Sequence, residues 1–393
     1  MARFLVVVPP LTGHVNPTLA VGATLRERGH DVAWSGPPGL LPSLLPDGAE
    51  FVPTNDIEIA DPIEAVRERS QGLRGPAALK FLWSDVLLPL ARGMVDGTDR
   101  AVAEFGPDAL LVDQQALAGA VVARRRGLRW LTSATTSAEL TDPLAALPQV
   151  DGWLRGELEA LQVEAGIDPA DAARGDLRFS DHGVLAFTTE ALYGADQPRP
   201  ANVHFVGPSI GSRPPDDDFP WEWLSDDVPH VLVSLGTLNA EAGGRFFTAA
   251  LEAFTDEKLQ AVVVAPPELL PNPPPNVLVR AHVPQLALLP HLHAVVSHAG
   301  HNTVCESLAN GLPLVVAPIR DDQPIIAEQV VRAGAGVRVR FGRARAADLR
   351  AAVADVLTDD RYRDAAAAIR RSFLAAGGPA AAADVLEDLA CRP

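Results

Sequence analysis

The segment from Ser297 to Glu306, Ser-His-Ala-Gly-His-Asn-Thr-Val-Cys-Glu, gathers the densest set of ligand-binding side chains in the sequence. An apolar strand is predicted to end at Ser297, a loop with Gly300 follows, and a helix is predicted from about Thr303. A helix start after a glycine loop collects unpaired backbone N–H groups and the positive end of the helix dipole, which suits a phosphate. His298 lies at the carboxyl end of the strand, where open α/β sheets bind ligands.

The side chains that follow extend this interpretation. Asn302 and Thr303 offer donors at the helix start, and Glu306, one turn further on, offers acceptors that suit sugar hydroxyls. The plainer alternative is an ordinary strand–helix turn in which Asn302 caps the helix. The segment alone favours neither interpretation.

Two further polar loops are expected at the same sheet edge. The first is Leu232–Thr237, where a strand runs into a glycine turn, and the second is Arg320–Pro324, which lies between a strand and a helix. Each has a structural alternative, because a glycine can simply turn the chain and Asp322 or Gln323 can cap the following helix. Three polar loops on one edge are harder to explain this way than one.

A histidine and an aspartate in the first half could form a catalytic pair. Asn16 and Pro17 predict a helix start, which places His14 between that helix and the apolar strand Phe4–Val8. Asp113 ends another predicted strand, so its carboxylate can reach the same edge. A carboxylate that fixes the tautomer of a histidine makes it a better base. The alternative is a histidine in a turn and an aspartate that caps a helix.

The elements that position these residues alternate between short apolar strands and helices, which predicts α/β architecture with parallel sheets. The pattern lapses in a segment rich in proline, glycine and aspartate. We therefore expect an N-terminal domain over residues 1–208, a linker over 209–229 and a C-terminal domain over 230–393. Alanine-rich helices at the C-terminal end could pack back on the first domain.

Several of these strings together resemble the nucleotide-sugar-dependent glycosyltransferases of the GT-B fold, in the branch with macrolide and plant natural-product enzymes. His282-Val-Pro-Gln285, Ser297–Glu306 and Asp322-Gln323 resemble the C-terminal signature of that family, and Pro9–Pro17 resembles its N-terminal signature. The resemblance implies two Rossmann-like domains that face each other across a cleft. It also implies an acceptor-binding first domain and a second domain that binds the nucleotide sugar.

The resemblance assigns roles in diphosphate and pentose binding. It implies that His298 contacts the diphosphate of the donor and that Asn302, Thr303 and Thr237 hold phosphate oxygens. Glu306 would bind the ribose hydroxyls. The helix terminus behind Gly300 supplies the anion site described above.

The resemblance also assigns contacts to the base and the transferred sugar. Gln285 and the backbone near Val283 would meet the base, and Asp322 and Gln323 would bind hydroxyls of the sugar. His282 stands where family members often carry tryptophan, so the sequence leaves the choice between uridine and thymidine open.

Composition excludes other classes of function. Among 393 residues, 33 are Lys or Arg and 50 are Asp or Glu, and the net charge of −17 argues against binding to nucleic acid or anionic lipid. The only lysines are Lys80 and Lys258, and no P-loop string occurs. Cys305 and Cys391 provide neither a disulfide framework nor a zinc ribbon. No apolar stretch reaches the ~18 residues of a membrane span, and no signal peptide is evident, so a cytoplasmic location is expected.

Three other signals do not support a rival function. Gly207–Gly211 matches G-x-S-x-G, but the prolines that follow prevent the helix that a nucleophile elbow requires. Gly334–Gly336 lacks the third glycine of a dinucleotide fingerprint. A group of histidines lacks metal-ligand spacing and a completing carboxylate, so neither a metal nor a cofactor is expected. These histidines are His291, His293, His298 and His301.

Two stretches of the first half, Asn55–Leu90 and Ser133–Trp153, depart from the α/β alternation and are rich in apolar residues. They could form an acceptor pocket, in which case the acceptor is apolar. They could equally be extra helices that pack on the core.

The sequence therefore predicts an inverting, metal-independent glycosyltransferase. It would move a hexose from a UDP- or dTDP-sugar to a hydroxyl of a small lipophilic natural product, with His14 as base and Asp113 as its partner. A homodimer is compatible with this prediction. Two rivals stay open at this point: a nucleotide-sugar 2-epimerase of the same fold, and a non-catalytic helper protein that resembles a glycosyltransferase.

Overall fold

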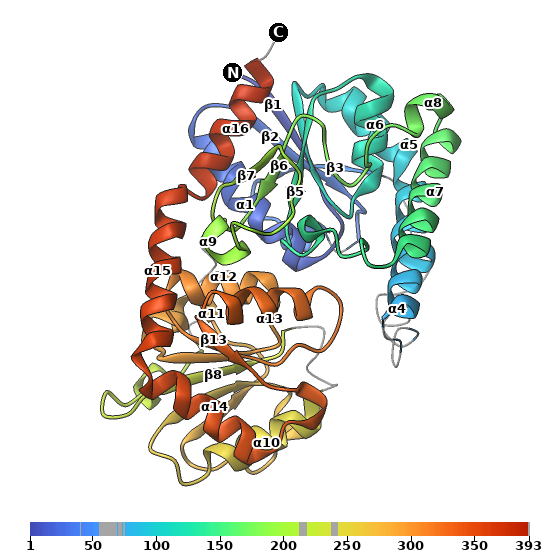
Figure 1. The fold of residues 1–393 in the computed structure, drawn as a ribbon. Coiled ribbons are helices and arrows are strands. Elements are labelled where there is room, and N and C mark those ends of the chain that lie inside the picture. The colour runs from blue at the N-terminus through green and yellow to red at the C-terminus, as the bar shows by residue number, and fades with distance from the viewer. Residues whose placement is uncertain are drawn as a thin grey trace. The chain divides into compact units, whose positions relative to one another are not determined.

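The computed structural model describes residues 1–39, 41–54, 69, 73, 75–211, 218–236 and 243–391 of the chain. The chain forms two compact units (Figure 1). Unit 1 takes in Met1–Phe187, Pro198–Gly211 and Ala376–Pro393, and unit 2 takes in Thr188–Gln197 and Ser212–Ala375.

Unit 1 is built on a seven-stranded sheet with the order β3-β2-β1-β4-β5-β6-β7. Every neighbouring pair of strands is parallel. The strands are β1 (Arg3–Val7), β2 (Asp31–Gly36), β3 (Glu50–Pro53), β4 (Ala109–Asp113), β5 (Trp130–Ala134), β6 (Val184–Ala186) and β7 (Val203–Phe205).

The helices of unit 1 cover both faces of this sheet (Figure 1). They are α1 (Thr12–Glu27), α2 (Leu41–Leu44), α4 (Pro76–Phe81), η1 (Leu82–Leu87), α5 (Leu88–Phe105), α6 (Leu117–Arg126), η2 (Glu139–Thr141), α7 (Pro148–Glu164), α8 (Pro169–Ala172) and α16 (Pro379–Cys391). Across the described ranges, we find no helix that is both long and apolar enough to cross a membrane.

Strand β1 shows why the central strands read as unbroken apolar runs. Its side chains alternate between two buried layers: Phe4 and Val6 belong to the core that contains α1 and α16, whereas Leu5 and Val7 belong to the core that contains α5 and α6. A parallel sheet with helices on both faces has no solvent-facing side, so both sets of side chains are apolar.

Of the two stretches predicted to depart from the alternation, the first is largely helical where the structure describes it, and the second consists mainly of turns between β5, η2 and the start of α7. Helix α4 continues through the π-helical turn η1 into α5, and the π turn lies just before Pro89, which has no N–H for an α-helical bond and would clash with the preceding turn. Trp83 and Leu144 are buried in the core of unit 1. For the described part, this packing fits the alternative of extra core helices. Residues 55–68 lie outside the described residues.

Unit 2 is built on a six-stranded sheet with the order β10-β9-β8-β11-β12-β13, again parallel throughout. The strands are β8 (His230–Ser234), β9 (Gln260–Val264), β10 (Val277–Arg280), β11 (Ala294–Ser297), β12 (Leu314–Val316) and β13 (Gly336–Arg338). The helices are α9 (Glu190–Tyr193), η3 (Trp221–Trp223), α10 (Gly244–Phe254), η5 (Pro267–Leu269), α11 (Gln285–Leu288), η6 (Leu289–His291), α12 (His301–Ala309), α13 (Gln323–Arg332), η7 (Phe341–Arg343), α14 (Ala346–Thr358) and α15 (Asp360–Ala376).

The division into units differs from the expected boundaries at residues 208 and 229. The segment Thr188–Gln197 belongs to unit 2, where the hydroxyl of Thr189 lies 2.8 Å from that of Ser372 on α15. The C-terminal helix α16 belongs to unit 1, although it follows unit 2 in the chain. Non-local packing decides both assignments. The place of Thr188–Gln197 leaves no mark in the local sequence pattern, whereas packing of the C-terminal helices on the first domain was among the expectations.

Helix α16 is held in unit 1 by apolar and ionic contacts. Leu386 is fully buried and shares a core with Phe4 of β1. Arg28, just after α1, donates to Glu387 at 2.7 Å, and the Nε2 of His30 lies 2.7 Å from the same carboxylate. Because exposed ion pairs contribute little, the buried leucine should provide most of the stability.

We expect Leu386→Ala to destabilise unit 1 by about 2–5 kcal/mol, because it leaves a cavity in the layer beside β1. Hydrogen exchange of the β1 amides under native conditions measures this loss. Leu374→Ala, which truncates a leucine that is 72% exposed on α15, is the matched control and should change protection little. Equal β1 protection in wild type and Leu386→Ala would contradict this account of α16.

Candidate active site

In each sheet the strand order reverses beside the first strand. Strand β1 lies between β2 and β4, and β8 lies between β9 and β11. At such a point the loops that leave neighbouring strands diverge to opposite faces, and a crevice opens at the carboxyl ends. His14 and Asp113 follow β1 and end β4, whereas Gly236 and His298 follow β8 and β11. Each unit therefore carries candidate residues at its own switch point.

The pair in unit 1 is in direct contact. The Nδ1 of His14 lies 3.0 Å from each carboxylate oxygen of Asp113. The Asp113 side chain is fully buried, and that of His14 is 16% exposed. With a proton on Nδ1, the imidazole donates to the carboxylate and carries its lone pair on Nε2, which is the form that a general base requires.

His14 lies inside a helix, which differs from the expected helix start at Asn16 and Pro17. Helix α1 begins at Thr12, and the N–H groups of His14 and Val15 both donate to the carbonyl of Leu11. The Asn-Pro pair resembles a helix start, but here it falls after the first turn. His14 is thus held by regular backbone structure rather than by a loop.

Thr135 is a member of this cluster that sequence analysis did not identify. Its Oγ1 lies 2.9 Å from Nδ1 of His14 and donates to Oδ2 of Asp113 at 3.2 Å. The other oxygen, Oδ1, accepts the backbone N–H of Gln115 at 2.8 Å. One signal could have found Thr135: it follows β5, the strand next to β4, and so lies at the same carboxyl edge.

In unit 2, the imidazole of His298 is enclosed between two glycines. A Cβ atom at Gly236 would lie 2.7 Å from Cε1 of His298, and one at Gly300 would lie 2.5 Å from Nε2. Side chains at either position would overlap the ring. Gly236 also has a φ of +72°, which favours glycine, whereas Gly300 has an ordinary φ of −63°. The requirement for glycine at 300 therefore comes from the imidazole.

The burial of His298 changes its acid–base behaviour. The residue is 9% exposed, and burial lowers the pKa of its imidazole from 6.5 to about 4, with partial opposition from a backbone interaction with Ser234. His298 is therefore neutral at physiological pH in the free protein.

The loop after β11 has the geometry of an anion site. Helix α12 begins at His301 with Gly300 at its N-cap, so Asn302 and Thr303 both lie in its first turn. Ala299 has a φ of +66°, and this left-handed conformation costs a non-glycine residue of the order of 1 kcal/mol. The helix starts slightly earlier than predicted, and its two polar residues keep their place at the helix terminus. Thr237, the predicted contact of the first loop, lies outside the described residues.

Two residues predicted to meet the nucleoside contact each other. The amide Nε2 of Gln285 donates to Oε2 of Glu306 at 2.5 Å, and Glu306 is buried with 4% of its surface exposed. The amide of Gln285 is thus directed at the carboxylate predicted to hold the pentose. His282 is exposed and Val283 is half-buried just before α11, and the carbonyl of Val283 accepts the N–H of Gln285 at 2.8 Å.

The last loop lies between β12 and α13. Helix α13 begins at Gln323, with Asp322 at the N-cap. The side-chain oxygen of Gln323 accepts the backbone N–H groups of Ile319 and Arg320 at 2.9 and 3.1 Å. Gln323 therefore stabilises its own loop through its side-chain oxygen. Its side-chain NH₂ group is the part that can act as a donor.

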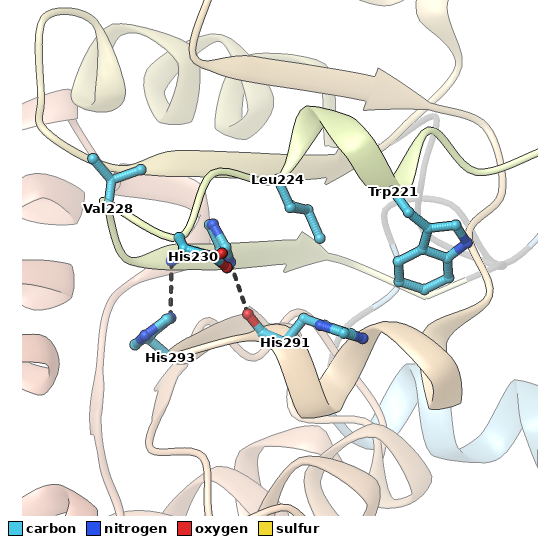
Figure 2. A pocket seen from close by; sticks show the side chains of 7 residues that line it. Trp221, Leu224, Val228, His230, His291 and His293 are labelled. Atoms are coloured by element: carbon cyan, nitrogen blue, oxygen red, sulfur yellow. Dashed lines mark hydrogen bonds between the residues drawn. The ribbon is translucent and has the colours of Figure 1, made fainter.

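The histidines that are close in the sequence separate into two places. His298 and His301 lie at the carboxyl end of β11, whereas His291 and His293 lie at its amino end (Figure 2). The latter two line a cavity of about 430 Å³ in unit 2 together with Trp221 and others. The remaining lining residues are Leu224, Asp226, Val228 and His230. Within the described ranges, no three His, Cys, Asp or Glu side chains gather closely enough to hold a metal ion.

Comparison with known proteins agrees with this arrangement. Residues 196–376 match the family model described as UDP-glucoronosyl and UDP-glucosyl transferase. The chain is 30% identical to 4'-demethylrebeccamycin synthase of Lentzea aerocolonigenes, over 99% of both chains. It is also 30% identical to demethyllactenocin mycarosyltransferase of Streptomyces fradiae, over 99% of this chain and 87% of that one. The solved glycosyltransferase of kitacinnamycin superposes with a TM-score of 0.78 at 27% identity and covers 99% of this chain and 98% of its own.

The two parallel α/β units, with their polar loops at the switch points, define a glycosyltransferase of the GT-B fold. The chain belongs to the UDP-glucoronosyl and UDP-glucosyl transferase family and is a glycosyltransferase of the antibiotic and natural-product type. Members of this family draw their sugars from nucleotide-sugar donors. The fold and the enzyme class predicted from the sequence are therefore confirmed.

The neutral state of His298 predicts a dependence of stability on pH. Between pH 6.5 and about 4 the unfolded chain binds a proton at this imidazole that the folded chain does not, so stability should fall as the pH is lowered through this window. Urea unfolding at pH 7 and pH 4.5 measures the effect. His298→Gln should lose less stability between the two pH values than wild type.

His282→Gln, which removes an exposed imidazole, is the control and should behave like wild type. An unchanged pH dependence in His298→Gln would show that the fold does not hold His298 neutral.

Proposed function

We propose that this enzyme transfers a hexose, with inversion, from a UDP- or dTDP-sugar to a hydroxyl of a small lipophilic acceptor. The observation that carries the proposal is the contact of His14 Nδ1 with both oxygens of Asp113 at 3.0 Å. This contact supplies a base in the tautomer that can accept a proton at Nε2. The names of the two relatives support an acceptor of natural-product type.

The proposed reaction is a single displacement. The acceptor hydroxyl gives its proton to Nε2 of His14, and its oxygen attacks the anomeric carbon on the face opposite the diphosphate. The bond from that carbon to the diphosphate oxygen breaks, and the nucleoside diphosphate leaves with the electron pair. Configuration at the anomeric carbon is thereby inverted. Asp113 stabilises the imidazolium that forms at His14.

The donor is proposed to bind at the switch point of unit 2. The first turn of α12 and the imidazole of His298 suit the diphosphate, where negative charge increases as the leaving group departs. Glu306, with Gln285 on one of its oxygens, suits the pentose hydroxyls. Asp322 and the amide group of Gln323 are proposed to contact the sugar. We propose that Val283 and His282 contact the base and that Asn302, Thr303 and Thr237 bind the phosphates.

We further propose that the reaction requires no metal and no other cofactor. A helix N-terminus and a histidine directed at the leaving group provide electrostatic stabilisation of the type that a divalent ion provides elsewhere. The cytoplasmic location and the homodimer also remain predictions.

Turnover should be the same before and after exhaustive chelation with EDTA, because protein groups stabilise the negative charge of the diphosphate. The measurement compares initial rates with EDTA, with added Mg²⁺ and with added Mn²⁺. Loss of activity with EDTA that either ion restores would contradict the proposal.

His298→Ala should weaken UDP or dTDP binding at least 10-fold and leave the fold intact, because it removes a group packed at the diphosphate site. Isothermal titration with each nucleotide measures the affinity, and far-UV circular dichroism checks the fold. Nucleotide affinity equal to that of wild type would refute the donor-site assignment.

His14→Ala should lose about 10²- to 10⁴-fold in turnover and keep its nucleotide affinity, because a general base acts on the acceptor alone. Asp113→Asn should lose less, since it orients and polarises the base. An acidic phenol acceptor should suffer less than an aliphatic alcohol, because it needs less help to lose its proton. Wild-type turnover of His14→Ala on the alcohol would show that His14 is not the base.

A further inference from the structure

We propose that Thr135 is a positioning residue for the catalytic base: its hydroxyl holds the Asp113 carboxylate and keeps the proton of His14 on Nδ1. This inference rests on the proposed role of His14 and deepens it. Thr135 would act through its two neighbours and would touch neither the acceptor nor the donor.

The three side chains form a closed triangle of polar atoms. Nδ1 of His14 faces Oδ1 and Oδ2 of Asp113 at 3.0 Å each and Oγ1 of Thr135 at 2.9 Å. Oγ1 of Thr135 in turn lies 3.2 Å from Oδ2 of Asp113. The parallel register, in which Asp113 pairs with Ser133, places Thr135 just past the end of the neighbouring strand. Sheet pairing therefore fixes the hydroxyl beside the carboxylate.

The direction of the hydroxyl hydrogen of Thr135 determines which tautomer of His14 is favoured. A hydroxyl has one hydrogen, and here that hydrogen is donated to Oδ2 of Asp113. The oxygen of Thr135 then turns a lone pair towards Nδ1 of His14. Nδ1 faces three oxygen acceptors, so the tautomer with a proton on Nδ1 is favoured. In that tautomer Nε2 holds the lone pair that accepts the substrate proton.

The burial of Asp113 explains why the carboxylate needs this support. Its side chain has no exposed surface, and a buried charge requires donors on its oxygens. The N–H of Gln115 donates to Oδ1 and the hydroxyl of Thr135 donates to Oδ2, so each carboxylate oxygen has a donor besides His14. Removal of one donor would let the carboxylate rotate away from the geometry in which it meets Nδ1.

Thr135→Val tests the proposal, because valine keeps the branched shape and removes only the hydroxyl. We expect kcat on an alcohol acceptor to fall roughly 10- to 100-fold, the loss typical of a hydrogen bond to a charged group. The KM for the donor and the affinity for nucleotide should stay at wild-type values. Thr135→Ser restores the hydroxyl and should recover most of the lost rate.

Ser133→Ala is the matched control. Ser133 lies on the same strand end, is fully buried, and has no hydrogen-bond partner for its hydroxyl among the residues that the structure describes. Its removal should leave kcat within about twofold of wild type. A drop equal to that of Thr135→Val would mean that any hydroxyl lost from this strand disturbs the site, and the inference would fail.

A double-mutant cycle separates positioning through Asp113 from a direct role. In the Asp113→Asn background, Thr135→Val should cost less than about threefold in kcat, because the carboxylate that it serves is already gone. The full 10- to 100-fold loss in that background would overturn the inference. A raised donor KM with unchanged kcat would also overturn it, since Thr135 would then act on the sugar.

The outcome for His14→Ala distinguishes this inference from the proposed function. If His14→Ala is inactive and Thr135→Val has wild-type kcat, the inference alone fails. If His14→Ala has wild-type turnover, the proposed base fails and the positioning role fails with it.

Discussion

The reversal of strand order at β1 and at β8 is the constraint on which the candidate residues of each unit depend. At these two points, neighbouring parallel strands send their following segments to opposite faces of the sheet. The polar side chains that follow or end those strands are therefore close together. His14 meets Asp113 for this reason, and His298 meets Gly236 for the same reason. A single rule of α/β topology thus brings together the proposed base in one unit and the proposed anion site in the other.

The two centres use buried polarity in opposite ways. In unit 1 the buried carboxylate of Asp113 is surrounded by hydrogen-bond donors and lies beside the imidazole of His14. In unit 2 the buried imidazole of His298 is kept neutral, because burial lowers its pKa. We therefore propose that the same residue type serves as a base in unit 1 and as a ligand for phosphate in unit 2.

Much of the fold could be predicted from the sequence, because apolar runs bounded by turns mark the strands. The strand ends predicted at Asp113 and Ser297 are the ends of β4 and β11. The candidate residues could be located because they follow such strands. The start of α1 was misplaced, since Asn-Pro carries the local signal of a cap and the true start at Thr12 has none. The position of Thr135 depends on strand register, and the place of Thr188–Gln197 in unit 2 depends on packing between distant segments. Local patterns encode neither.

The enclosure of His298 by Gly236 and Gly300 has a consequence for how this loop can diverge among homologues. Gly300 has a backbone conformation open to any residue, so the ring of His298 alone forbids a side chain there. A lineage that acquires a larger residue at 300 must therefore first replace the histidine at 298. After the first of these two steps, the protein has lost the imidazole at 298 and still has glycine at 300. The volume of the imidazole therefore fixes the order of the two substitutions, although the backbone at 300 would accept other residues.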